Sequence, residues 1–187
     1  MIVIRLRQKR LEEELSQLKW FEGNTLTVYH GGRWDGRTRI KVTGRGALGV
    51  GAYFSPNSQV AADYARDSGL DYLVQCELNL ANPLTIEEAG HFHPAIQALI
   101  QLGEDKAKAI RLINAAEAKM GYPGEQLRSR AMAAGHDSLI RKHNGGIYEI
   151  VIWNPKLVVN PKKLSLDDNV LQENLKDRTI MMFRPVS

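Results

Sequence analysis

The feature of this sequence that most constrains its fold is a predicted β-hairpin between residues 137 and 153. The segments DSLIRKH and IYEIVIW flank Asn144-Gly145-Gly146, and an asparagine-glycine pair between apolar segments is typical of a tight hairpin turn. The second segment carries apolar side chains on both faces, which is the pattern of a central strand. The fold is therefore expected to contain a sheet that is covered on both sides.

Glu149 is the single acidic residue of this apolar strand. Burying a carboxylate is costly unless it is paired, and an ionisable group kept in such surroundings is a candidate for a functional site. Two other interpretations stay open, namely a salt bridge to an arginine and a place at an exposed end of the strand. Glu149 is the first candidate catalytic residue.

A second strand is predicted over TLTVYHGG, where Leu26, Val28 and His30 share one face and a glycine pair ends the strand. Further along, residues 44–49 have the spacing GxGxxG and are followed by VGAYFS, which also predicts a strand. The dinucleotide-binding fingerprint with this spacing requires a helix at its last glycine. The strand pattern therefore argues against a dinucleotide-binding fingerprint here. The glycines are instead expected to allow a tight turn beside a ligand or a neighbouring strand.

Helical and extended patterns alternate through the rest of the chain. A helix is predicted from Pro56 to about Gly69, with Tyr64 in the apolar stripe that turns inward. A half-buried strand is predicted over DYLVQCELNL, and residues 84–135 show helical periodicity. Strands on either side of a helical stretch predict the α+β class, with a helical insert over residues 84–135.

Length and composition indicate a single domain, since 187 residues with 43% hydrophobic side chains can bury one substantial core. We expect an amphipathic helix within residues 1–24 and the main domain over residues 25–160. Residues 161–187 are expected to form a C-terminal extension packed on the same domain.

The cysteine and histidine content excludes several classes of protein. The lone Cys76 allows no internal disulfide and fits a reducing cytoplasm. No apolar segment is long enough to cross a bilayer, and the N-terminus is too charged for a signal peptide, so a soluble cytoplasmic protein with no membrane partner is expected. His91 and His93 lack other ligands at metal-binding spacing, so no metal is predicted.

The net charge of +4 is concentrated between Gly31 and Gly46. This stretch holds five cations and one acid, namely Arg33, Arg37, Arg39, Lys41, Arg45 and Asp35. Alternation with Thr38, Ile40 and Val42 predicts that the middle cations share one exposed face. The stretch is either a solvated loop or a local anion site.

Taken together, these residues resemble the ADP-ribosyltransferases of the histidine-tyrosine-glutamate branch, which includes diphtheria-toxin-like enzymes and poly(ADP-ribose) polymerases. The resemblance covers residues 30–155. Its motifs are similar to Tyr29-His30-Gly31, Gly51-Ala52-Tyr53-Phe54 and Glu149 in EIVIWNP, in the family's order. Tyr64 comes after Tyr53 at the spacing that lets two tyrosines enclose the nicotinamide ring in similar enzymes.

The resemblance implies a split mixed β-sheet core and a role for each matched residue. NAD⁺ would be consumed as a substrate, without a metal. His30, Gly31, Tyr53 and Tyr64 would bind NAD⁺, with the tyrosine rings stacked on the cationic nicotinamide. Glu149 would stabilise the positive charge that develops on the ribose as the glycosidic bond breaks.

Two groups of basic residues receive secondary roles from the resemblance. Arg33 and Arg45 are candidates for phosphate contacts. The loop before the glutamate strand recognises the target in similar enzymes, which makes Arg141, Lys142 and His143 candidates for target recognition. The expected acceptor is a macromolecule, and family analogy favours protein over nucleic acid.

The sequence also departs from the family in two places and leaves two alternatives open. Gly32 stands where many relatives have serine or threonine, and Ala61 stands where polymerase-type members have serine, which makes the chain look closer to the toxin-like members. One alternative is an NAD⁺ glycohydrolase, with water as the acceptor. The other is a nucleic-acid-binding module that uses the basic face from Arg33 to Arg45.

Overall fold

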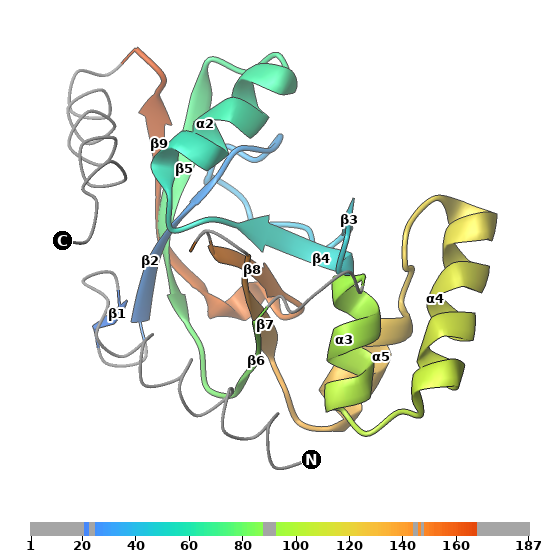
Figure 1. The fold of residues 1–187 in the computed structure, drawn as a ribbon. Coiled ribbons are helices and arrows are strands. Elements are labelled where there is room, and N and C mark those ends of the chain that lie inside the picture. Colours follow the sequence, from blue (N-terminus) through green and yellow to red (C-terminus); the bar gives the residue numbers. More distant parts are fainter. Residues whose placement is uncertain (1–20, 23–24, 88–92, 144–145, 147, 168–187) are drawn as a thin grey trace, which may run out of the picture.

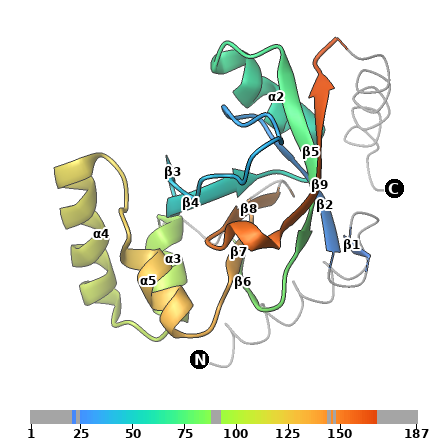
Figure 2. The ribbon, with the colours of Figure 1, turned by 180° about the vertical axis from the view of Figure 1, so that it is seen from behind.

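The structure, a computed structural model, describes residues 21–22, 25–87, 93–143, 146 and 148–167. The described strands form one sheet of four strands and one of five, with helices at both ends of the molecule. This arrangement, seen in Figure 1 and from behind in Figure 2, confirms the predicted α+β class with a mixed, divided sheet.

The four-stranded sheet contains the first predicted strands. Its order is β1 (Phe21–Glu22), β2 (Thr25–His30), β5 (Tyr72–Asn79) and β9 (Val158–Ser165), and all neighbours are antiparallel. The strand predicted over DYLVQCELNL is confirmed as β5. β9 crosses the predicted domain boundary at residue 160, so the first part of the C-terminal extension is a strand of the core sheet.

The five-stranded sheet carries the predicted hairpin. Its order is β3 (Gly44–Gly46), β4 (Gly49–Phe54), β8 (Tyr148–Ile152), β7 (Ser138–Lys142) and β6 (Pro83–Glu87). β7 and β8 pair antiparallel, as predicted from the segments DSLIRKH and IYEIVIW. The GxGxxG segment forms the turn of the β3–β4 hairpin and opens no helix, which confirms that it is not a dinucleotide-binding fingerprint.

The helical insert begins later than predicted, because residues 84–87 belong to strand β6 and not to a helix. β6 pairs in parallel with β7, and Leu84, Thr85 and Ile86 are buried. A short apolar segment has the same local pattern in a buried helix and in a buried strand. The non-local pairing with β7 decides the outcome here.

The described helices gather at two places. Helix α2 (Ser58–Asp67) lies beside the four-stranded sheet, whereas α3 (Pro94–Gln101), α4 (Lys106–Met120) and α5 (Gln126–Ala133) lie at the opposite end of the molecule (Figure 1). Asn57 and Asp105 cap α2 and α4 by accepting hydrogen bonds from the backbone of the first turn. A short 3₁₀ helix, η1 (Pro155–Leu157), precedes β9.

Strand β8 lies between two hydrophobic cores. Ile150 and Ile152 join the core between the two sheets, whereas Val151 and Trp153 join the core beneath the helical insert. Both faces of β8 are therefore covered, as predicted from its apolar pattern.

Several predictions concern residues outside the described ranges, among them the tight turn at Asn144-Gly145. The amphipathic helix is predicted within residues 1–24, of which the structure describes only Phe21 and Glu22 in β1. His91 and the end of the C-terminal extension, residues 168–187, also lie outside the described residues.

Candidate active site

Tyr53 and Glu149 lie on adjacent strands and on the same face of the five-stranded sheet. Tyr53 of β4 pairs with Val151 of β8, and Glu149 is two residues further along β8, so the side chains of Tyr53, Val151 and Glu149 point to one side. Burial raises the pKa of Tyr53, and the negative charge of Glu149 raises it further. The sheet therefore brings these two candidate residues together.

Arg141 holds the Glu149 carboxylate from the neighbouring strand. The two residues are direct partners in the β7–β8 register, and a guanidinium nitrogen of Arg141 donates to Oε2 of Glu149 at 3.1 Å. Nε2 of His143 lies 3.7 Å from the same oxygen. The Glu149 side chain keeps 22% of its surface exposed, against 9% for Arg141. The acid is thus paired, in agreement with one interpretation of the sequence, and it is still reachable from solvent.

His30 is fixed to the strand that carries Tyr53. Its Nδ1 lies 2.8 Å from the backbone oxygen of Tyr53, and its ring packs against the rings of Phe54 and Trp34. A carbonyl oxygen can only accept, so Nδ1 carries the proton and Nε2 of the neutral ring is an acceptor. Burial lowers the pKa of His30, which favours this neutral form.

Acidification is expected to destabilise the protein through His30. Below the ordinary pKa of 6.5 the unfolded chain takes up a proton that the folded His30 does not, so the free energy of unfolding falls as pH falls through this range. One such group contributes at most about 1.4 kcal/mol per pH unit. In His30→Asn, urea denaturation between pH 7 and pH 5 should show a smaller loss of stability than in the wild type.

His93 adds to the same pH dependence of stability, since burial also lowers its pKa. Its contribution is present in both proteins and cancels in the difference between them. Parallel stability curves for wild type and His30→Asn would contradict the assignment of a buried neutral His30.

The glycine pair after His30 allows two close approaches. A Cβ atom built on Gly31 would lie 2.0 Å from the backbone oxygen of Ala61, so Gly31 packs directly on helix α2. A Cβ built on Gly32 would lie 2.5 Å from Nε2 of His30. The absence of serine or threonine at Gly32 is therefore explained by the space that the His30 ring occupies.

The position of Tyr64 on helix α2 differs from the prediction. The structure buries Ala61, Ala62 and Ala65 of this helix, whereas the Tyr64 side chain is 64% exposed and does not point inward. The alanine face packs against the four-stranded sheet beside Gly31, which leaves no room for a large ring there. Tyr64 is near enough for its charge to contribute to the raised pKa of Tyr53.

Comparison with known proteins assigns the family. Residues 21–181 match the family described as ADP-ribosyltransferase in polyvalent proteins. The chain belongs to this ADP-ribosyltransferase family. No curated protein matches the sequence. Among solved structures, the chain is similar to one titled crystal structure of an anti-CRISPR protein, with 18% identity, coverage of 76% of this chain and 97% of that chain, and a TM-score of 0.42.

The basic stretch of this ADP-ribosyltransferase domain does not form the strand that its alternation suggested. Residues 36–43 form no strand, although Arg37, Arg39 and Lys41 are exposed as predicted. Arg37 and Arg39 join Lys156 around a polar depression of about 310 Å³. Arg33 is exposed, and the guanidinium of Arg45 lies 5.2 Å from the centre of the Tyr122 ring.

The three residues predicted to recognise the target all contact acids of this domain. Arg141 and His143 face Glu149, and Nζ of Lys142 lies 3.9 Å from Glu87. Their role in acceptor recognition stays a prediction. The sequence carries a signal for the Arg141–Glu149 pair, because the predicted hairpin puts the two apolar segments on adjacent strands, where the structure pairs residues 141 and 149.

The described residues bear on the metal and membrane predictions. Within the described ranges, no group of three or more histidine, cysteine or acidic side chains is placed to hold a metal ion. His93 instead contacts Glu117, with Nε2 3.1 Å from Oε1. None of the described helices is long and apolar enough to cross a membrane.

Proposed function

We propose that this ADP-ribosyltransferase is a histidine-tyrosine-glutamate type enzyme that cleaves the nicotinamide–ribose bond of NAD⁺ and transfers a single ADP-ribose to an acceptor. The observation that carries the proposal is the convergence of His30, Tyr53 and Glu149. These residues are far apart in sequence, yet His30 bonds to the backbone of Tyr53, and Glu149 lies beside Tyr53 on the same sheet face.

Glu149 is the proposed catalytic residue. As the glycosidic bond lengthens, its electron pair leaves with nicotinamide and positive charge develops on the ribose. A carboxylate already oriented by Arg141 would bind a ribose hydroxyl and stabilise that charge without first reorganising. The acceptor nucleophile then bonds to the same carbon and loses its proton to solvent. Arg141 acts through Glu149 and is a positioning residue.

Tyr53 is held so that its ring orientation is fixed. Its hydroxyl donates to the backbone oxygen of Gly49 at 2.7 Å. A Cβ on Gly46 would lie only 2.7 Å from Cζ of Tyr53, so the ring rests on a surface that only glycine leaves open. In the proposal Tyr53 stacks on the nicotinamide ring, and the exposed Tyr64 of α2 approaches from the other side.

His30 would anchor the adenosine side of NAD⁺. With Nδ1 committed to Tyr53, Nε2 is left as an acceptor for a ribose hydroxyl. The exposed Arg33 and Arg45 are the proposed phosphate contacts. The polar depression lined by Arg37, Arg39 and Lys156 is a separate place, where an anionic group of the acceptor could bind.

A protein acceptor is proposed, and labelled NAD⁺ tests it. The purified protein is incubated with cell lysate and NAD⁺ that carries one label on the adenosine and another on the nicotinamide. Transfer predicts free nicotinamide and adenosine label on protein that survives denaturation. Free labelled ADP-ribose with no labelled macromolecule would identify a glycohydrolase. Label on nucleic acid, or no release of nicotinamide, would contradict the proposal.

A further inference from the structure

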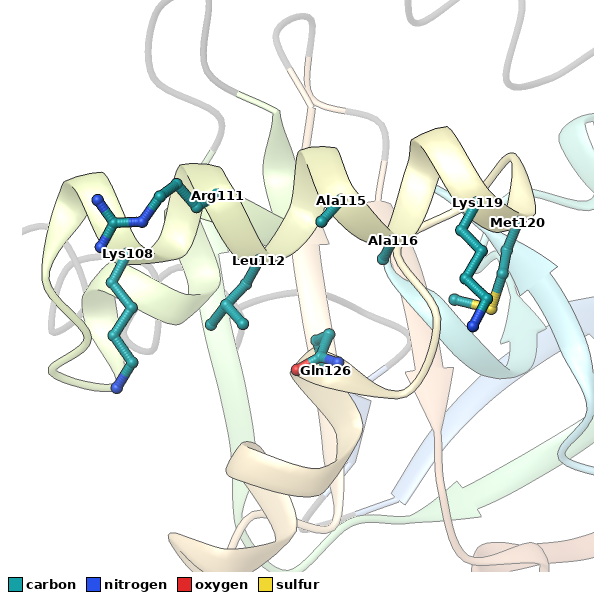
Figure 3. Close-up of a pocket in the computed structure, with 8 residues that line it drawn as sticks. All are labelled: Lys108, Arg111, Leu112, Ala115, Ala116, Lys119, Met120 and Gln126. Carbon is teal, nitrogen blue, oxygen red and sulfur yellow. The ribbon is translucent and has the colours of Figure 1, made fainter.

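Among the described residues, the helical insert leaves an open groove on helix α4. One face of α4 is buried at Ala109, Ile113 and Ala116, and the first two of these residues pack into the core beneath the insert. Next to this face lies a groove of about 400 Å³ between α4 and Gln126 at the start of α5. Figure 3 shows Leu112 and Met120 pointing to this side of α4, toward Gln126.

The floor of the groove is an apolar stripe. Leu112, Ala115, Ala116 and Met120 line it from successive turns of α4. From Leu112 to Met120 the helix rises by eight steps, or about 12 Å, which is the length of about two turns of a partner helix. Met120 is 44% exposed, and exposed apolar surface with a polar rim is a mark of an interaction site.

The rim of the groove is basic. The charged residues among the described lining are Lys108, Arg111 and Lys119, and none of the described lining residues is acidic. Lys108 pairs with Glu104 at 2.8 Å. Within the part of the chain that the structure describes, Arg111 and Lys119 make no ion pair. An apolar floor between cations is complementary to a segment with an apolar face and acidic flanks.

We propose that this α4 groove binds an acidic amphipathic helix of a partner protein, and that this partner is the acceptor of ADP-ribose. A helix fits because the floor is a single helical stripe into which side chains at positions i, i+3, i+4 and i+7 can pack. The terminal segments of this chain match the groove less well, because residues 1–20 carry more basic than acidic side chains and residues 168–187 carry both signs equally.

The groove adjoins the hairpin that carries Tyr53. A Cβ built on Gly124 would lie 2.6 Å from Cε of Met120, and the backbone oxygen of Gly124 accepts a hydrogen bond from the backbone nitrogen of Val50 at 3.1 Å. Val50 precedes Tyr53 in β4. The Met120 end of the groove is thus linked through Gly124 to the strand that carries Tyr53. This role as an acceptor site depends on the proposed function, whereas binding itself does not.

A peptide-binding assay without NAD⁺ tests the groove independently of the transferase activity. The probe is a fluorescent helical peptide of about 18 residues, with leucine along one face and glutamate on the others. Its affinity is measured by anisotropy for wild type, Met120→Glu and Met132→Glu. Met132 is a matched control, because it is 48% exposed on the neighbouring α5 and does not line the groove. Both variants add the same charge.

We expect Met120→Glu to raise the Kd about 10-fold or more and Met132→Glu to leave it nearly unchanged. Lys119→Glu should also weaken binding, as a second variant that alters the rim only. The proposal is overturned by an equal effect of the two methionine variants, by equal binding of a scrambled peptide, by tighter binding of a lysine version, or by no binding of the acidic peptide. Unchanged binding by Glu149→Gln would separate docking from catalysis.

Discussion

Glu149→Gln is expected to reduce ADP-ribose transfer about 100-fold or more while NAD⁺ binding is largely retained. The carboxylate is needed most when positive charge develops on the ribose, and losing one preorganised electrostatic contact typically costs about 100- to 1,000-fold in rate. Glutamine keeps an oxygen that can accept from Arg141, so the hairpin should keep its pairing. The measurements are nicotinamide release under single-turnover conditions and NAD⁺ affinity by calorimetry.

Glu104→Gln is the matched control for this experiment. Glu104 is similarly part-exposed, at 18% against 22% for Glu149, and it also pairs with an arginine, with Oε1 2.6 Å from Nε of Arg130. It lies before α4, in the helical insert. Equal activity of Glu149→Gln and wild type, or an equal loss in both glutamine variants, would remove Glu149 from the mechanism.

Gly31→Ala is expected to destabilise the fold by about 3 kcal/mol, which is the upper part of the range for overpacked sites. The added methyl would lie 2.0 Å from the oxygen of Ala61 and 2.9 Å from the nitrogen of Ala65, both of which are backbone atoms of α2 that cannot rotate away. Helix α2 must move, and Tyr64 moves with it. Urea denaturation measures the loss, and NAD⁺ affinity should fall as well.

Gly121→Ala separates this steric effect from the general cost of replacing a glycine. Gly121 ends α4 with φ of 75°, and a Cβ there would have no neighbour within 4 Å. Only backbone strain applies, at about 1 kcal/mol. If Gly121→Ala proves as destabilising as Gly31→Ala, the close contact between Gly31 and α2 is not a constraint on the fold.

The sequence predicted those elements whose local pattern agrees with their tertiary environment. The pairing of β7 with β8 was predicted from the two apolar segments and the asparagine-glycine pair between them, and β5 was predicted from its alternation. Residues 44–49 were correctly separated from a dinucleotide-binding turn, because the segment VGAYFS after them has the pattern of a strand and not of a helix. Strand β6 was missed because its pairing with β7 joins residues more than 50 positions apart. No local pattern contains that information.

For the candidate site, the sequence supplied the residue types and their order, but few of the contacts between them. The resemblance implied that Tyr53 and Glu149 act together, but the pairing of β4 with β8 is non-local and no strand pattern contains it. The outward position of Tyr64 could not be expected either, since a tyrosine in an apolar stripe normally turns inward. Helix α2 approaches the end of β2 so closely at Gly31 that only small side chains are buried on its inner face. The pair of Arg141 and Glu149 was readable from the hairpin register.

The last described strand of the four-stranded sheet bears on how the protein behaves in concentrated solution. β9 is an edge among the described strands, and Pro161 cannot donate a backbone hydrogen bond there. Lys162 and Lys163 are exposed beside it, and Asn160 interrupts the extended backbone with φ of 51°. Such an edge is a poor template for a strand of another molecule. Self-association into fibrils is therefore disfavoured along this side.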